Sequence, residues 1–487
     1  MFADINLTEA KPIYTQIHDY IKEMIKTGML PHGSKLPSTR ELGKIINVSR
    51  NSIIKAYESL EDDELVYTIK GKGTFVSHVK VILEDKWTID WTDKINNYAN
   101  NADKLDIIKT EKKYKKGMIS FKSIAPDGSL FDMEEFKRAF SSRISIEREK
   151  ILNYGYAQGY KPLIDYLMEY MQSKGVNTTN KDILVTNGFT EGFDIVLSSL
   201  TKKGDKLLCE NPTHNTALKI MKLQGLDVIG IDMKEDGLNI SKLKSSLKEN
   251  DIKIAYLVPS YHNPTGIVTS SEKRQEIYNI LKEHNIPIIE DGFNEELLYL
   301  GSHIAPMAAF CGEGNGVIYI GSFSKILFPG MRIGWVLGDK KLIDILESVK
   351  RSKNIHTSFL DQALLYEYLK NGGFDKYLKK ARKFYKDKYT LAVKLATKYI
   401  PCESIIGDGG LHIFIKLKNI DARELLNECY KKGVLFLPGD IFSTNNQGEN
   451  TFRLGFSRVS DEDMKKGFKI IGECIKHLSV TNPHSNK

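Results

Sequence analysis

The chain has 487 residues, of which 41% are hydrophobic and 27% are charged, a composition that suits a globular protein of about three domains. Its N-terminus lacks the basic flank and apolar core of a signal peptide, and no run of about 18 apolar residues suggests a membrane span. The net charge of +8 is compatible with nucleic-acid binding but does not require it. The five cysteines form no C-x-x-C pair, so we expect no metal site, no disulfide framework and a cytoplasmic location.

Residues 1–78 are predicted to form a winged helix-turn-helix. A first helix runs from Pro12 to Thr27, where isoleucine and methionine recur at helical spacing. A second helix begins at Ser38 with the capping box S-T-R-E, and a third begins at Ser49 after a tight turn. Two short strands, 65–69 and 74–76, flank the sequence KGKG and predict a hairpin that serves as the wing.

Basic residues gather in the second and third predicted helices. Five of them lie between Lys35 and Tyr57 against one acid, Glu41, whereas acids cluster at 61–64. Such an uneven distribution is expected of a DNA-binding surface. The N-terminus of a recognition helix enters the major groove, where arginine can pair with guanine and asparagine with adenine. The candidate DNA contacts are Lys35, Arg40, Arg50, Asn51, Ser52, Lys70, Gly71 and Lys72.

The stretch from Ile13 to Ser77 resembles the DNA-binding domain of GntR-type bacterial regulators. The pieces LPSTREL, VSRNS and GKGTFV carry the resemblance. It implies that Arg40, Arg50, Asn51, Ser52 and the wing pair Lys70-Gly71 touch DNA. The alternative is a winged helix that contacts another protein.

Residues 79–116 are polar and rich in Lys and Asn, and they are predicted to form a linker that is partly helical near Trp87–Ala102. From there to residue 487, short apolar strands alternate with amphipathic helices, which predicts a mostly parallel sheet with helices on its faces. A smaller α+β lobe is expected at about 374–478. The predicted strands are 182–186, 206–209, 253–258, 286–290 and 317–320.

Chemically suitable residues follow several of these strands. Lys325, in GSFSK, could form a Schiff base with an aldehyde cofactor, and Arg332 could bind the cofactor's phosphate. Asp291 could keep a pyridine nitrogen protonated, and Asn263, in NPTG, could donate to a phenolate. Each motif alone is as consistent with an ordinary turn.

A fourth motif, NGFT at 187–190, opens a predicted helix whose backbone N–H groups could hold a phosphate. Ligands of open α/β sheets bind at the carboxyl ends of the strands, where all four motifs fall. Together they predict a site for pyridoxal phosphate.

Residues 117 to about 478 resemble fold-type I aminotransferases, with NPTG and GSFSK as the specific motifs. The resemblance implies that Lys325 forms the imine with pyridoxal phosphate, that Asp291 holds the pyridine nitrogen and that Asn263 binds the phenolate. It places Arg453 on a substrate carboxylate, a role that suits a planar guanidinium. It further implies a phosphate site made by Phe189, Thr190, Ser322, Ser324 and Arg332, a stacking ring from His214, and a contact from Tyr154 to a neighbouring subunit's phosphate.

Two departures from that family concern the ring of the cofactor. The usual tyrosine two or three residues after the aspartate is absent, because Phe293 and Asn294 occupy those positions. The stacking residue is His214 rather than Tyr, Phe or Trp. We expect the cofactor to bind while the acid–base balance of its imine is altered, so that turnover is slow.

The combination of both parts resembles the MocR/GabR family of bacterial regulators. It implies a transcriptional regulator that binds a double-stranded DNA operator, forms a head-to-tail homodimer, has no contact with membranes, and senses pyridoxal phosphate or an amino compound through Lys325. The main alternative is an active aminotransferase that carries a DNA-binding domain. A third possibility is a sensor of pyridoxal phosphate alone, in which Arg453 would be a remnant.

Overall fold

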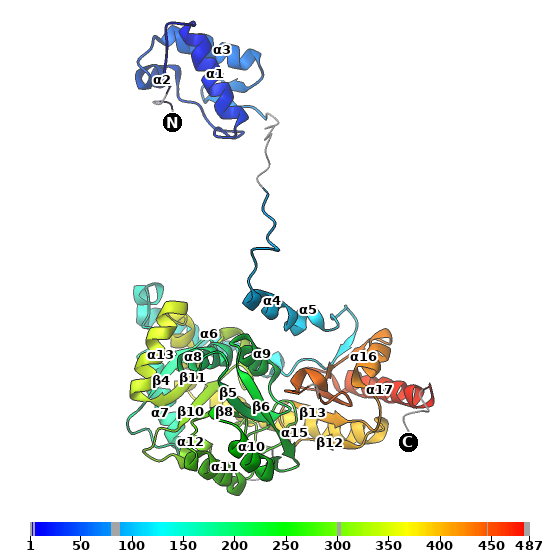
Figure 1. Cartoon of the computed structure of the whole chain (residues 1–487). Coiled ribbons are helices and arrows are strands. Elements are labelled where there is room, and N and C mark those ends of the chain that lie inside the picture. Colours follow the sequence, from blue (N-terminus) through cyan, green and yellow to red (C-terminus); the bar gives the residue numbers. More distant parts are fainter. Residues whose placement is uncertain (1, 3–4, 79–87, 300–302, 446, 482–487) are drawn as a thin grey trace. The chain divides into compact units, whose positions relative to one another are not determined.

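The computed structural model describes residues 2, 5–78, 88–299, 303–445 and 447–481 (Figure 1). By its internal contacts the chain divides into two compact units, Met1–Ile95 and Asn96–Lys487, which are described separately below. The division falls inside the predicted linker of 79–116, and two short helices of the second unit, α4 (Asn97–Lys104) and α5 (Ile107–Thr110), also lie within that range.

The described residues of the first unit form three α-helices and a hairpin. Its elements are α1 (Ile13–Lys26), α2 (Thr39–Ile45), α3 (Arg50–Asp62), β1 (Val66–Ile69) and β2 (Gly73–Val76). The strands pair antiparallel from Val66↔Val76 to Ile69↔Gly73, and the core is formed by isoleucine and leucine side chains of all three helices. This is the winged-helix order that the sequence predicts.

Local capping explains where the second and third helices begin. Ser38 accepts a hydrogen bond from the backbone N–H of Glu41 at 3.3 Å, and the Glu41 carboxylate accepts one from Ser38 N–H at 2.9 Å. Ser49 likewise accepts from the N–H of Ser52 at 3.2 Å. Both predicted helix starts are therefore confirmed, because each cap satisfies backbone N–H groups that have no partner inside the helix.

The large lobe of the second unit is built on an eight-stranded sheet in the order β4-β11-β10-β9-β8-β5-β6-β7. Strands β5, β6, β8, β9 and β10 pair in parallel, and β11 runs antiparallel between β4 and β10. Helices cover both faces of the sheet (Figure 1). The bounds are β4 (Lys181–Thr186), β5 (Lys206–Asn211), β6 (Asp227–Lys234), β7 (Gly237–Leu238), β8 (Ile252–Leu257), β9 (Ile288–Asp291), β10 (Val317–Ser322) and β11 (Gly334–Asp339).

All five strands predicted after the linker lie in this sheet, whereas β6, β7 and β11 were not predicted. The carboxyl ends of β4, β5, β8, β9 and β10 point to one edge, so the loops after them meet there. The helices of the lobe are α6 (Met133–Glu147), α7 (Lys161–Ser173), α8 (Phe189–Leu200), α9 (Asn215–Leu223), α10 (Ile240–Glu249), α11 (Ser271–Glu283), α12 (Met307–Phe310), α13 (Lys340–Lys353) and α14 (Phe359–Lys370).

The small lobe has a four-stranded antiparallel sheet in the order β12-β13-β16-β15. Helix α15 (Gly373–Tyr399) connects the lobes, because Phe374 is buried in the large core and Ala392 in the small one. An early strand, β3 (Ile119–Ser120), pairs in parallel with β14 (Val434–Leu435) and so joins this lobe. The other bounds are β12 (Ser404–Ile406), β13 (His412–Lys416), α16 (Ala422–Lys431), β15 (Leu437–Pro438), β16 (Thr451–Gly455) and α17 (Asp461–Thr481).

None of the helices in the described part of the chain combines the length and the hydrophobicity that a bilayer span requires.

Candidate functional site

The predicted DNA-contacting residues of the first unit lie largely on its surface. Arg50 and Asn51 are exposed in the first turn of α3, directly after the capping residue Ser49. Ser52 is the exception, since it is half-buried and its hydroxyl lies 2.9 Å from that of Ser49. Its side chain therefore contacts the residue that caps the helix.

The turn between α2 and α3 holds the two helices close together. Asn47 adopts a φ of +54°, and the N–H of Val48 donates to the carbonyl of Gly43 at 3.0 Å. A Cβ atom on Gly43 would lie 3.1 Å from the carbonyl oxygen of Val48, so a small residue is needed there. The side chain of Arg50 donates from Nε to Thr39 Oγ1 at 3.4 Å, which ties the two helix starts together.

The wing presents exposed lysines at its tip. Lys70, Gly71 and Lys72 are exposed, and Gly71 has a φ of +80°, a backbone conformation that favours glycine. Lys35 is exposed beside the hairpin, where it forms an isolated bridge with Phe75. Arg40 is exposed on α2. The unit thus offers basic side chains from α2, α3 and the wing.

In the second unit, Asp291 is a buried carboxyl with one described hydrogen bond, from the hydroxyl of Tyr256 to its Oδ2 at 2.8 Å. Burial raises its pKa to about 7. His214 Nδ1 lies 3.9 Å from the same oxygen, but burial lowers the pKa of His214 to about 3, so the imidazole supplies no positive charge. A cationic group opposite Asp291 would therefore stabilise its ionised form.

A cradle of backbone and guanidinium groups lies at the start of α8. Gly188 precedes the helix with a φ of +78°, and a Cβ atom there would lie 2.7 Å from Arg332 Nη2. Arg332 donates to Ser324 Oγ at 2.9 Å and to the carbonyl of Asn187 at 3.2 Å. The first N–H groups of a helix lack internal acceptors, so those of Phe189 and Thr190 are suited to an anion.

Glycine is also required opposite the cradle. A Cβ atom on Gly334, at the start of β11, would lie 2.8 Å from the backbone of Gly188. The antiparallel strand β11, which the sequence analysis did not foresee, thus packs directly against the cradle. Ser322 ends β10 beside it and accepts from the N–H of Ser324 at 3.2 Å.

Lys325 follows this loop and is surrounded by positive charge. Burial, and then the neighbouring Arg453, Arg332 and Arg458, lower the pKa of its amine to about 8. A larger fraction of the amine is therefore neutral, and nucleophilic, than in an exposed lysine. Arg458 was not among the predicted residues.

Arg453 is a buried arginine on β16 with no acidic partner among the described residues. It donates from Nη1 to Asn263 Oδ1 at 2.6 Å and from Nη2 to the carbonyl of Lys122 at 3.1 Å. Its Nε is buried without a hydrogen-bond partner in the described structure, and the ring of Phe442 lies 5.0 Å from the guanidinium carbon. Burial lowers its pKa to about 9. The geometry favours an incoming anion.

The residues after Asp291 provide no phenolic hydroxyl. The ring of Phe293 is 6.4 Å from that of His214, and His214 is 5.4 Å from the ring of Phe189. Asn294 has a φ of +55°, and neither polar atom of its buried amide has a hydrogen-bond partner in the described structure. The hydroxyl nearest to the carboxyl comes instead from Tyr256, which the sequence analysis missed.

Tyr154 differs from the other predicted cofactor residues. It is 82% exposed, and its ring contacts that of His356 edge-on at a centroid distance of 5.9 Å. The remaining predicted residues come from the segments after β4, β5, β8, β9 and β10 and from β16, and hydrogen bonds or charge interactions join several of them around Lys325.

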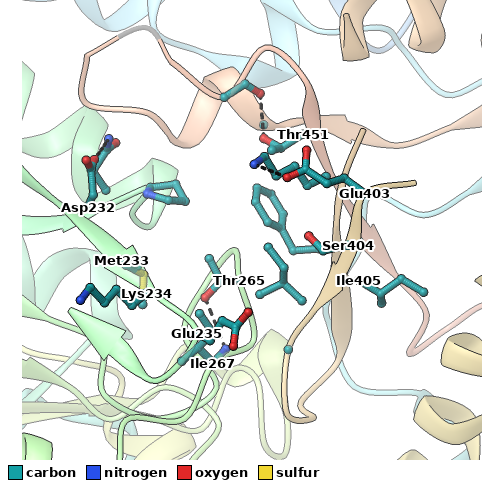
Figure 2. Close-up of a pocket in the computed structure, with 18 of the residues that line it drawn as sticks. Asp232, Met233, Lys234, Glu235, Thr265, Ile267, Glu403, Ser404, Ile405 and Thr451 are labelled. Atoms are coloured by element: carbon teal, nitrogen blue, oxygen red, sulfur yellow. Dashed lines mark hydrogen bonds and ion pairs between the residues drawn. The ribbon is translucent and has the colours of Figure 1, made fainter. Parts of the chain in front are cut away.

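A separate cavity of about 900 Å³ lies between the two lobes of this unit (Figure 2). Thr265 and Ile267 line it from the loop that carries Asn263, and Ser404 and Ile405 line it from β12. Glu403 forms an ion pair across its wall with Lys416 at 2.7 Å. None of its lining residues was predicted to bind the cofactor.

Comparison with known proteins identifies both units. Residues 116–471 match the family model described as aminotransferase class I and II, and residues 13–76 match that of the bacterial regulatory proteins of the gntR family. The uncharacterized HTH-type transcriptional regulator YdfD of Bacillus subtilis is 29% identical over 96% of this chain and 97% of its own.

Enzymes are also among the relatives. Aromatic-amino-acid aminotransferase 1 of Thermococcus litoralis is 29% identical over 74% of this chain and 88% of its own. The crystal structure of LysN, an alpha-aminoadipate aminotransferase from Thermus thermophilus complexed with N-(5'-phosphopyridoxyl)-L-leucine, matches with a TM-score of 0.74 and 28% identity, over 81% of this chain and all of that one.

The predicted fold classes of both parts, and their fusion in one chain, are confirmed by these matches. Because the larger family model covers residues 116–471, the chain belongs to the aminotransferase class I and II family, and it carries a gntR-type DNA-binding domain at its N-terminal end.

Proposed function

We propose that the protein is a DNA-binding transcriptional regulator whose aminotransferase-like unit binds pyridoxal phosphate at Lys325 and responds to this cofactor, to an amino compound, or to both. The observation that carries the proposal is the presence in one chain of an exposed winged-helix surface and a cluster of basic side chains around Lys325. The similarity to YdfD, which is named a transcriptional regulator and matches over both parts, supports it.

The residues around Lys325 fit pyridoxal phosphate. A protonated pyridine nitrogen would compensate the buried Asp291 carboxyl, whose pKa is raised to about 7. The cradle at Gly188 and Arg332, with Ser322, Ser324 and the N–H groups of Phe189 and Thr190, offers donors to a phosphate. LysN, whose structure carries a phosphopyridoxyl group, has the same fold.

The remaining roles concern the ring and the ligand. Asn263 accepts from Arg453 through Oδ1, which leaves its Nδ2 to donate to the phenolate oxygen. His214 would stack on the ring, and Lys325 would provide the amine that attaches the cofactor. When bound, the cofactor supplies an aldehyde that reacts with amines and a ring that withdraws electrons. Arg453 would hold the carboxylate of an amino compound.

DNA recognition is assigned to the first unit. Arg50 and Asn51 would read base edges in the major groove, while Lys35, Arg40, Ser52 and the wing residues Lys70, Gly71 and Lys72 would bind phosphates or the adjacent groove. The exposure of all of these residues except Ser52 supports this assignment.

The protein is also proposed to be a homodimer with a head-to-tail arrangement. The second unit exposes six large apolar side chains from α6, the 3-10 helix Arg148–Leu152, the segment after it and the loop after α13. Large exposed apolar side chains are expected where another protein surface covers them. In this arrangement Tyr154 would reach the phosphate of the neighbouring subunit. The residues are Ile144, Ile146, Leu152, Tyr154, Tyr156 and Ile355, which are 42% to 86% exposed.

An active aminotransferase remains the alternative, since most residues of the pocket and one group of relatives are those of enzymes. Transfer of an amino group at about 1 s⁻¹ or faster would favour it. Replacement of the usual tyrosine by Phe293 argues for slow turnover instead. Phe293→Tyr should shift the midpoint of the pH titration of cofactor absorbance, and an unchanged midpoint would contradict this explanation.

The deciding experiment measures binding of the purified protein to DNA from its own upstream region, with and without pyridoxal phosphate and at several salt concentrations. Lys325→Ala is compared with Lys340→Ala, an exposed lysine of α13. We expect specific binding that the cofactor changes in the wild type and in the Lys340 variant but not in the Lys325 variant.

Two outcomes separate the alternatives. Absence of specific DNA binding together with transamination at enzymic rates would establish the enzyme. An Arg453→Ala variant that keeps its full response to pyridoxal phosphate would identify a sensor of the cofactor alone, whereas loss of a response to amino compounds would identify an amino-compound sensor.

A further inference from the structure

The segment that leads from the winged helix into the second unit is held by an ion-pair cluster at Glu111. Glu111, only 7% exposed, accepts from Arg423 of α16 at 3.1 and 3.4 Å, and the Nε of Arg423 donates to Asp440. The Tyr430 hydroxyl donates to the carbonyl of Lys113 at 2.9 Å. We call Glu111, Arg423 and Asp440 the linker anchor.

The part of the segment before the anchor is held more lightly. Neither α4 nor α5 has a buried residue, and Tyr98 and Ile108 are 57% and 76% exposed. Helix α4 packs on α9, the helix that begins directly after His214. Because few contacts of this segment are buried, its local opening costs little free energy. Small changes in the residues that contact it can therefore alter how firmly residues 97–110 are attached.

Two routes of contact lead from Arg453 to this segment. In the first, Arg453 Nη2 donates to the carbonyl of Lys122, and Lys122 Nζ donates to the carbonyl of Lys112 at 3.2 Å, one residue from Glu111.

In the second route, the guanidinium of Arg453 lies over the ring of Phe442. Phe442 ends the 3-10 helix Gly439–Phe442, which contains Asp440 of the linker anchor. The carbonyl of Phe442 also accepts from the N–H of Thr213, next to His214, at 2.8 Å. The pocket and the anchor therefore share one short helix.

We propose that the linker anchor couples Arg453 to residues 97–113, so that a carboxylate bound at Arg453 changes how firmly the chain leading to the winged helix is held. The proposal rests on the proposed function, because it assigns a regulatory consequence to the pocket at Lys325. It requires only contacts within the second unit and the continuity of the chain.

The geometry of Arg453 explains why a carboxylate should act on this route. A bidentate carboxylate binds an arginine either at Nη1 and Nη2 or at Nε and Nη2. Both modes use Nη2, the nitrogen that donates to the carbonyl of Lys122. The buried, unpaired Nε favours the second mode. Because Nη2 carries two N–H groups, a carboxylate at Nε and Nη2 shares this nitrogen with the carbonyl of Lys122 and draws the guanidinium away from that carbonyl and from the ring of Phe442. Binding of the carboxylate therefore weakens both routes of contact that begin at Arg453.

A matched pair of ligands isolates the carboxylate. N-phosphopyridoxyl-L-alanine and N-phosphopyridoxyl-ethylamine share the ring, the phosphate and the two-carbon amine, and differ only in the carboxyl group. Hydrogen exchange of the amides in residues 97–113 is measured on the full-length protein, without cofactor and with each ligand at saturation. Calorimetry establishes the ligand concentration at which the protein is saturated. The variants are Arg423→Gln, Glu111→Gln and, as control, Arg351→Gln, which removes an exposed ion pair on α13.

In the wild type and the Arg351 variant, exchange in residues 97–113 should differ between the two ligands by about 5-fold or more, the lower limit of typical coupling between sites. In the Arg423 and Glu111 variants this difference should disappear, while both ligands still bind. Equal exchange with both ligands in the wild type, or a difference that survives in both variants, would overturn the coupling and leave the proposed function intact. Failure of both ligands to bind the wild type would instead overturn the proposed function and this inference with it.

Discussion

The two proposed functional surfaces are built in opposite ways. The DNA-reading surface is exposed, comes from residues 35–72 and depends on caps and turns within a few residues of each contact. The site at Lys325 is buried at its centre, where Asn263, Asp291 and Arg453 lie, and its residues come from positions between Lys122 and Arg458. Exposed charges are screened by water and salt, whereas buried ones act strongly on each other. Substitutions should therefore have larger and more coupled effects in the pocket than on the DNA surface.

The largest effect is expected at Asp291. Asp291→Asn removes the carboxylate opposite the pyridine nitrogen, and a hydrogen bond to a charged group is worth about 1.5–3 kcal/mol, or roughly 10- to 150-fold in affinity. Affinity for pyridoxal phosphate should fall by that factor in an absorbance titration, with Asp344→Asn, which alters a carboxyl on α13, as control.

The same variant tests the raised pKa of Asp291 in the protein without cofactor. The pKa of Asp291 is raised from 3.8 to about 7 in the folded protein, so the folded state holds its proton more tightly than the unfolded state. Its contribution to stability is present at low pH and is lost as pH rises from about 4 to 7. Cofactor-free wild type should lose stability across this range relative to Asp291→Asn, and parallel profiles would contradict the raised pKa.

A smaller loss should follow a change in the cradle. Gly188→Ala forces a side chain into a φ of +78° and to 2.7 Å from Arg332, and such backbone strain costs about 1–3 kcal/mol. We expect a lower melting temperature and weaker binding of pyridoxal phosphate. Gly204→Ala has a comparable φ of +87° with open space around it, so it should lower stability without changing affinity for the cofactor.

On the DNA surface, two exposed residues should behave differently from each other. Arg50→Ala should cost about 1–3 kcal/mol and relax sequence preference, because a base contact is lost. Lys70→Ala should weaken binding to all sequences alike and reduce the salt slope by about 1. Fluorescence anisotropy with operator and scrambled DNA would distinguish them, and an identical loss on both DNAs for Arg50 would remove it from the base-reading set.

The smallest effect should come from a helix cap. Ser38→Ala removes the acceptor for Glu41 N–H and should cost about 1 kcal/mol in the first unit. Hydrogen exchange should rise in α2 and leave the large sheet of the second unit unchanged. Exchange that rises equally in both units would show that they do not respond separately.

The same contrast explains what could be predicted from sequence. The capping box at Ser38 and the glycines of the wing are local signals, and they indicated the correct elements. Lys325, Asp291 and Asn263 were recognisable because parallel strands deliver their carboxyl ends to one edge. Each of these inferences used a motif and its immediate neighbours.

Features that depend on contacts between residues far apart in the sequence were missed. Tyr256 lies in a buried strand, and no residue near it in the sequence predicts its hydrogen bond to Asp291. The sequence indicates only that a buried tyrosine hydroxyl needs some partner. The contact of Arg453 with Lys122 joins residues 331 positions apart. Strand β11, which runs antiparallel to both of its neighbours, was also missed, and the high exposure of Tyr154 follows from its surroundings rather than from its own sequence.

The pairing of β3 with β14 has a consequence for synthesis on the ribosome. The winged-helix unit needs only contacts within its own short stretch, so it can fold as soon as it emerges. Ile119 leaves the ribosome soon afterwards, yet its partner Val434 follows only after nearly the whole second unit has been made. A prematurely terminated chain would therefore carry a finished DNA-binding unit beside an apolar strand with no partner, a species prone to aggregation and unable to sense a ligand.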